Sequence, residues 1–112
     1  MSRRRPYLPR TPERVLQRST YATADALVRE IEASADRGMV VVVRRFGVQA
    51  FSIVRNDVNM LVRPHPLSDR EPVGTYHDAA TALRAGDRWA DAVARGGEVA
   101  IDGGDNWPRG AA

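Results

Sequence analysis

The chain has 112 residues, a formal net charge of +3 and no cysteine. This length fits one domain with a modest core, and the lack of cysteine excludes disulfides, thiol chemistry and cysteine-ligated metals. No apolar run approaches the roughly 20 residues that cross a bilayer, and no signal-peptide core follows the arginine-rich start. We therefore expect a cytoplasmic protein without membrane contact.

Positive charge is concentrated at the N-terminus. All 17 basic residues are arginine. Residues 1–20 hold six arginines and one acid, a net charge of +5, whereas residues 21–112 hold eleven arginines and thirteen acids, a net charge of −2. The first 20 residues therefore carry the whole positive excess of the chain.

The first segment has no hydrophobic periodicity. Residues 1–10, MSRRRPYLPR, combine a basic triplet with two prolines, which predicts an extended arm that either contacts phosphates or only keeps the chain soluble. Residues 11–13, Thr-Pro-Glu, are typical of a helix start. The segment 15–21 fits either a short turn or an edge strand that leads into the next helix. We assign residues 1–19 to a basic N-terminal arm.

The next segment predicts a helix of about 15 residues. Thr23 is a suitable N-cap, Asp25 lies in the first turn, and Gly38 closes the helix as a C-terminal cap does. The apolar positions fall on one stripe and comprise Ala24, Leu27, Val28, Ile31 and Ala35. The helix therefore covers a core with one face.

Two β-branched runs follow, separated by Gly47 in the sequence MVVVVRRFGVQAFSIVR. Valines 40–43 place apolar side chains on both faces of a strand, which indicates that the strand is covered from both sides. In the second run, Phe51 and Ile53 share one face. Gly47 permits a tight reversal, so a hairpin is favoured over a bulged continuous strand. A third strand over 58–62 then completes a meander.

The second half predicts another helix between two strands. Residues 63–72 contain three prolines and read as a loop, after which residues 73–76 lead to Asp78, the N-cap of a helix that ends near Arg95. Gly86 weakens this helix by roughly 1 kcal/mol relative to alanine, which suggests a close packing contact there. The alternating segment 98–102, EVAID, predicts a last strand.

These elements predict an α+β fold: a small two-layer sandwich with a mainly antiparallel sheet of four to six strands and two helices on one face. The domain spans residues 20–104, and residues 105–112 form a C-terminal tail. Segments 20–43 and 75–102 share the order Thr-Tyr, N-cap, helix and strand, which suggests an internal repeat. A chance recurrence of common capping residues is the alternative.

The segment 73–105 carries a wider pattern, in which a strand enters a helix, the helix closes on glycine, and a second strand ends in Gly-Asp. The positions concerned are Asp78, Ala82, Gly97, Ile101, Gly104 and Asp105. This pattern resembles the C-terminal half of a family of short bacterial proteins of unknown function. The resemblance implies the fold of this half and no activity, and the chain departs from it at Asn106 and Trp107.

Residue types needed for catalysis are scarce. His65 and His77 are the only histidines, and neither lies in a motif with a serine or an acid, so we expect no enzyme. The paired glycines near the C-terminus lack the lysine and spacing of a phosphate loop. A metal site would need Asp87, Asp91, Asp102 and Asp105 together, and a solvated helix face explains the first two with fewer assumptions. We expect no metal and no cofactor.

These exclusions leave binding. The first hypothesis is a non-enzymatic module that contacts nucleic acid, or an assembly that contains it, through arginines on phosphates. The arginines assigned to this role are Arg3, Arg4, Arg5, Arg10, Arg44 and Arg45, with Arg55 and Arg63 further along the sheet. The alternative is a protein-interaction or inhibitor-like accessory protein of plasmid or phage type, which binds through a sheet edge or helix face or forms a homodimer.

Overall fold

The computed structural model describes residues 12–66 and 71–96. In chain order the elements are β1 (Glu13–Gln17), a 3-10 helix η1 (Arg18–Thr20), α1 (Ala24–Asp36), β2 (Val40–Arg44), β3 (Phe51–Asn56), β4 (Asn59–Pro64), β5 (Gly74–Tyr76) and α2 (Ala79–Ala94). The strands form one sheet in the order β1-β2-β3-β4-β5. β1 is parallel to β2, and the other pairs are antiparallel.

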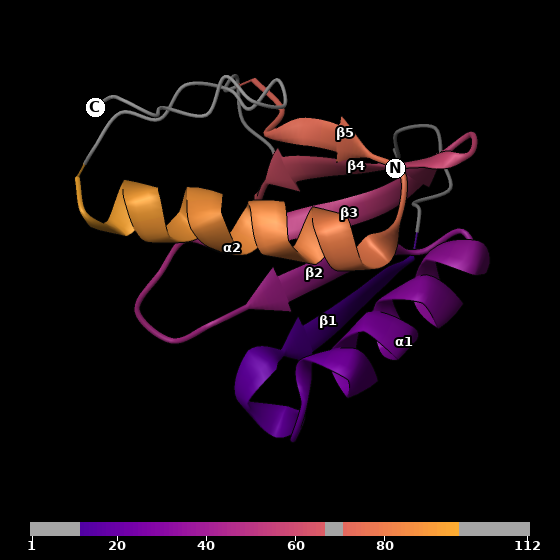
Figure 1. The fold of residues 1–112 in the computed structure, drawn as a ribbon, viewed down its shortest axis with the longest axis horizontal. Coiled ribbons are helices and arrows are strands. Elements are labelled where there is room, and N and C mark those ends of the chain that lie inside the picture. The colour runs from indigo at the N-terminus through magenta and orange to yellow at the C-terminus, as the bar shows by residue number, and fades with distance from the viewer. Residues whose placement is uncertain (1–11, 67–70, 97–112) are drawn as a thin grey trace, which may run out of the picture.

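Both helices lie on one side of the sheet (Figure 1). The predicted two-layer α+β sandwich is therefore confirmed, with five strands in a mixed sheet. β2 is an internal strand between β1 and β3, as its run of valines indicated. β2, β3 and β4 form the predicted meander.

Local side-chain chemistry sets the ends of both helices. The Thr23 hydroxyl oxygen accepts a hydrogen bond from the backbone N–H of Ala26 at 3.1 Å, and an Asp78 carboxylate oxygen accepts one from the N–H of Thr81 at 2.7 Å. Such caps satisfy N–H groups that have no partner inside the helix. α1 is followed by Gly38 with φ +83°. The sequence therefore predicted the start of each helix correctly.

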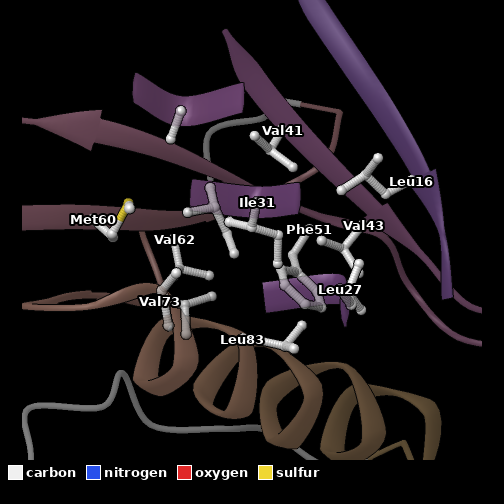
Figure 2. Close-up of a cluster of buried hydrophobic side chains, with 14 of the residues drawn as sticks. Leu16, Leu27, Ile31, Val41, Val43, Phe51, Met60, Val62, Val73 and Leu83 are labelled. Carbon is white, nitrogen blue, oxygen red and sulfur yellow. The ribbon is translucent and has the colours of Figure 1, made fainter. Parts of the chain in front are cut away.

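The core lies between the helices and the near face of the sheet. Alternation along each strand turns one set of side chains toward the helices, and the register pairs Val41 with Ile53, Val43 with Phe51, and Ile53 with Val62. Figure 2 shows the strand side chains Val41, Val43, Phe51 and Val62 gathered with Leu27 and Ile31 of α1 and Leu83 of α2. The residues named here are at most 3% exposed.

Gly86 lies where α2 packs directly against Phe51 of the sheet. A Cβ atom at this position would lie 2.2 Å from Cε2 of Phe51, far inside van der Waals contact. The phenyl ring occupies the space that a side chain on α2 would need. The packing contact predicted from this mid-helix glycine is therefore confirmed.

The connection between β2 and β3 is a hairpin, as favoured. Gly47 has φ +84°, a conformation that glycine adopts readily. β3 begins at Phe51, later than the predicted start at residue 48, because residues 45–50 form the loop. Two hydrogen bonds hold the C-terminal end of this loop. Gln49 Nε2 donates to the His65 carbonyl oxygen at 2.6 Å, and the His65 N–H donates to the Ala50 carbonyl oxygen at 3.1 Å.

The N-terminal prediction requires a correction. The helix start predicted at residues 11–13 is wrong, and the edge-strand alternative is right, since β1 pairs with β2 from Glu13 onward. Pairing with β2 buries Leu16 to 2% exposure, which an isolated turn would leave in water. The strand takes residues 13–17 out of the arm that was predicted to reach residue 19.

Several predicted segments lie outside the described residues. They are the arm over 1–10, the last strand over 98–102 and the tail over 105–112. The second strand of the proposed repeat belongs to this group, so the repeat stays a prediction.

Candidate nucleic-acid interface

The sheet has a second face, opposite α1 and α2, which we call the helix-free face. Its side chains follow from strand alternation and register: Gln17 lies beside Arg44, Val42 beside Ser52, and Ser52 beside Arg63. The full set is Glu13, Val15, Gln17, Val40, Val42, Arg44, Ser52, Val54, Asn56, Asn59, Leu61, Arg63 and Thr75. It combines an apolar centre with polar and cationic positions around it.

A hollow lies on this face. Its volume is about 540 Å³, and its lining comprises Glu13, Val40, Ser52, Val54, Arg63, His65 and Pro66. Val40, Val54 and Pro66 supply its apolar lining, beside the guanidinium of Arg63 and the imidazole of His65. In the middle of the face, Val42 is fully buried and Ser52 is 4% exposed, so that part is closed to water.

Two arginines of the helix-free face are cations without a counterion. Among the described residues, neither Arg44 nor Arg63 forms an ion pair, and Arg44 is exposed. Glu13 is the only acid among the strand residues on this face of the described sheet. The face therefore has an excess of positive charge.

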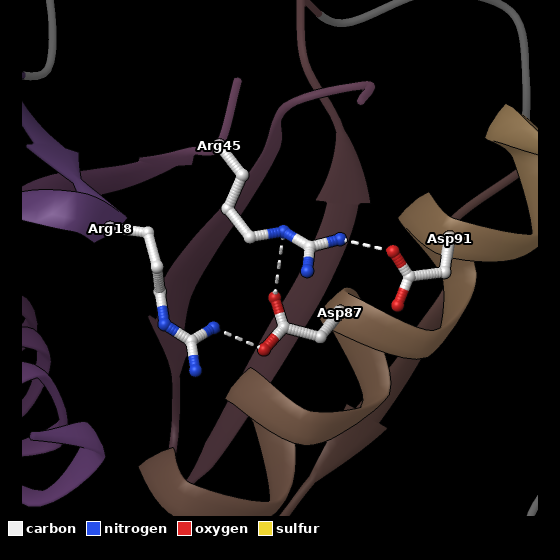
Figure 3. A network of polar contacts seen from close by, with 4 residues as sticks. All are labelled: Arg18, Arg45, Asp87 and Asp91. Atoms are coloured by element: carbon white, nitrogen blue, oxygen red, sulfur yellow. Dashed lines mark hydrogen bonds and ion pairs between the residues drawn. The ribbon is translucent and has the colours of Figure 1, made fainter. Parts of the chain in front are cut away.

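Arg45 has a different role, because its side chain is on the helix side. One of its terminal nitrogens lies 2.5 Å from Oδ1 of Asp91, and its Nε lies 3.6 Å from Oδ1 of Asp87. Arg18 of η1 pairs with the other oxygen of Asp87, so one carboxylate joins two arginines from different segments (Figure 3). This network ties η1 and the β2–β3 loop to α2.

Burial makes the network a structural feature. The side chains of Asp87 and Arg45 are 19% and 25% exposed. The Nε of Arg45 and the Oδ1 of Asp87 are buried and have no hydrogen-bond partner in the described structure. They lie 3.6 Å apart, so the opposite charge of each group offsets part of the cost of burying the other. The prediction that Asp87 belongs to a solvated helix face is wrong, and Arg45 is occupied by acids.

Other arginines of the folded body are paired in the same way. Arg14 lies 3.2 Å from Glu30 of α1, and Arg55 lies 2.6 Å from Asp36 at the end of α1. Of the four body arginines predicted to face phosphates, Arg44 and Arg63 are therefore the two without an acidic partner among the described residues. Arg3, Arg4, Arg5 and Arg10 lie outside the described residues.

Sequence reasoning missed the division of charge between the two faces. The signal was the alternation of side chains along β1 and β2. Arg14 pairs with Val41, so it points to the helix side, whereas Arg44 pairs with Gln17 and points to the helix-free face. Reading it required knowing that residues 13–17 form a strand parallel to β2. Pairing between segments so far apart does not follow from local pattern.

The contact of the His77 side chain in the described structure is with the residue that caps α2. His77 Nε2 lies 3.0 Å from Oδ2 of Asp78, but that carboxylate caps α2, and hydrogen bonding from the Thr81 backbone N–H lowers the pKa of Asp78. Within residues 12–66 and 71–96, no three potential ligands among histidine, aspartate and glutamate are arranged to hold a metal ion.

No family model, curated protein or solved structure matches this chain. The resemblance of residues 73–105 to a family of short bacterial proteins therefore stays a prediction. Neither α1 nor α2 has the length and apolar character that crossing a membrane requires.

Proposed function

We propose that the protein is a non-enzymatic module that binds nucleic acid through the helix-free face and the basic N-terminal segment. The observation that carries the proposal is the positive excess of the helix-free face. Arg44 and Arg63 have no acidic partner among the described residues, and Glu13 is the only acid among the described strand residues of this face. Unpaired guanidinium groups are the usual ligands of phosphates.

The connectivity of the chain supports this assignment. The carbonyl oxygen of Pro12 accepts a hydrogen bond from the Val40 N–H at 2.9 Å, and β1 starts beside Val40, which lines the hollow. The segment 1–11 is thus attached next to the helix-free face. Its arginines are tethered within roughly 40 Å of this attachment, because a fully extended residue spans about 3.6 Å.

Salt dependence tests the proposal. We expect the full-length protein to bind DNA or RNA of unrelated sequence, with an affinity that falls steeply as salt rises, because each phosphate contact releases counterions. Substituting Arg3, Arg4 and Arg5 by glutamine should weaken binding and make the dependence on salt less steep by roughly two to three contacts.

A matched control removes the same charge from the helix layer. Arg29, Arg37 and Arg95 are exposed and form no ion pair within the described residues, so their triple substitution by glutamine changes the net charge equally. We expect this variant to bind almost as the natural protein does. Equal losses in the two triple variants would show that net charge alone acts, and a natural protein that binds no nucleic acid would refute the proposal.

A second candidate function follows from the edge of the sheet. β1 is an edge strand of the sheet formed by the described residues, and since the Pro12 carbonyl faces β2, the backbone groups of Glu13, Val15 and Gln17 face outward. Val15 is 52% exposed, whereas a β-branched residue in a strand covered by a neighbour is normally buried. Such an edge accepts a strand from a protein partner or from a second copy of the chain.

The test of this candidate is the substitution of Val15 by proline in the full-length protein. Proline removes an N–H that the described sheet does not use, and edge strands tolerate it. If the edge mediates self-association, sedimentation equilibrium should show a dimer for the natural protein and a monomer for V15P. The substitution Val58→Asp, in the β3–β4 turn, is the control, and a natural protein that stays monomeric at high concentration argues against self-association.

A further inference from the structure

Phe46 is the most exposed large apolar side chain among the described residues. It is 97% exposed, compared with 70% for Val58 and 52% for Val15. It lies in the β2–β3 loop, directly after Arg44 and Arg45 and before Gly47. Both faces of an aromatic ring exposed to this extent are open to a ligand, and contact with a ligand would remove its apolar area from water.

The loop that carries Phe46 is held at both ends. On one side, Arg45 is fixed to α2 by Asp87 and Asp91 (Figure 3). On the other side, Gln49 donates to the carbonyl oxygen of His65 at the end of β4. The ring is thus presented on an anchored turn, which lowers the entropy that a ligand would have to remove on binding.

The surroundings of Phe46 distinguish between kinds of ligand. A hollow of about 450 Å³ adjoins the ring and is lined by Gln17, Arg44, Arg45, Gly47 and the segment 48–50. Val58 is in the turn at the opposite end of β3, and neither it nor Val15, the other exposed large apolar residue of the described surface, lines this hollow. The centre of a protein interface is normally a continuous apolar patch. A single ring beside a cation and amide groups is instead typical of sites for single-stranded nucleic acid.

We infer that Phe46 is a stacking platform for an unpaired base of single-stranded nucleic acid, with Arg44 on an adjacent phosphate. The inference rests on the proposed function and specifies its ligand, since bases inside a duplex do not offer a face to the ring. Gln17 and Gln49 line the same hollow and supply amide donors and acceptors near the base.

The test compares three ligands, at equal total concentration of phosphate groups, with the full-length protein: a single-stranded oligonucleotide of about 12 residues, the same strand with abasic sites, and the corresponding duplex. We expect the single strand to bind most tightly. The variant Phe46→Ala should weaken its binding by about fivefold or more and leave duplex binding nearly unchanged. Binding of the abasic strand should be insensitive to this substitution.

Two further variants complete the design. Phe46→Trp should keep the affinity for the single strand, and its added indole fluorescence should be quenched when a base stacks on it. Val58→Ala is the matched control, because it truncates an exposed apolar residue in another turn. Thermal unfolding followed by circular dichroism should show all three variants folded, since neither position contributes to the buried core.

Each outcome decides between the proposals. If single strands bind and Phe46→Ala has no effect, or if it weakens duplex and single strand equally, the stacking inference is wrong while the proposed function stands. If no nucleic acid binds the natural protein, both are wrong. If Phe46→Ala instead abolishes binding to a purified protein partner, the ring fills a protein pocket and the stacking inference is overturned.

Discussion

Gly86 shows how one missing side chain sets the distance between two layers. Because its Cβ would meet the Phe51 ring at 2.2 Å, α2 approaches the sheet more closely there than an alanine would allow. In an exposed helix, replacing glycine by alanine stabilises by about 1 kcal/mol, whereas overpacking a core costs about 1–3 kcal/mol. The second effect is the larger one at this position.

We therefore expect Gly86→Ala to lower the free energy of unfolding by about 1–2 kcal/mol, measured by urea denaturation. In a Phe51→Leu background, where the smaller side chain makes room, the same substitution should become neutral or stabilising. An equal loss in both backgrounds would mean that the ring is not the cause.

Asp78 combines a structural role with a dependence on pH. Its carboxylate accepts a hydrogen bond from the Thr81 N–H at 2.7 Å, and that bond lowers the pKa of Asp78 in the folded state. A group whose pKa is lower in the folded than in the unfolded state stabilises the fold above the unfolded pKa, about 3.9. This contribution is lost as the pH falls through the folded pKa.

Asp78→Ala should cost about 1 kcal/mol at neutral pH, as the loss of an N-cap generally does. Asp78→Asn retains a capping oxygen and does not titrate, so it is the matched control. The stability of the natural protein relative to Asp78→Asn should fall as the pH drops below about 4, when thermal unfolding is followed across pH. A difference that stays constant with pH would contradict this role.

At the scale of elements, the network around Asp87 connects three segments that no strand pairing joins. Asp87 contacts two arginines and is 19% exposed, whereas Asp91 pairs with Arg45 and is 46% exposed. Removing a half-buried carboxylate leaves two guanidinium groups without compensation, but a well-exposed ion pair contributes little. The two acids should therefore differ in importance.

Asp87→Asn should destabilise by about 1–3 kcal/mol, and Asp91→Asn by less than about 1 kcal/mol, in chemical denaturation. The first substitution should also speed hydrogen exchange in the β2–β3 loop, since it weakens the hold of α2 on Arg45. Similar small effects from both substitutions would place the network among ordinary surface ion pairs.

At the scale of the whole molecule, the order of the strands predicts a gradient of stability. β3 lies in the middle of the sheet with Phe51 and Ile53 in the core, whereas β1 and β5 are edges. Amides in the best-packed element open only with global unfolding, and outward-facing amides of an edge exchange almost freely.

In native-state hydrogen exchange, amides of β3 should be the most protected, and those of Val15 and Gln17 should exchange fast. The fast exchange of Val15 and Gln17 is expected at low protein concentration, where the chain is monomeric. If Val15 became protected as the concentration rises, a second strand would be pairing with β1, which would favour the protein-interaction candidate over a simple monomer.

Much of the fold was predictable because it depends on local rules. Thr23 and Asp78 cap helices through their own side chains, Gly47 turns a hairpin, and the composition of the valine run predicts the burial seen at Val41, Val42 and Val43. Each of these effects acts within a few residues, so a pattern in the chain is enough to reveal it. The two helices, the meander and the packing contact at Gly86 all followed.

The candidate site depended on contacts that only the folded chain creates. Arg18 and Asp87 are separated by 69 positions in the sequence, and nothing near either residue shows that they meet. Whether an arginine is free or paired depends on which elements pack together, so Arg44 and Arg45 look alike as neighbours in the chain and differ completely in the fold. The parallel pairing of β1 with β2 was hidden for the same reason, because short strands acquire their partners from the tertiary structure.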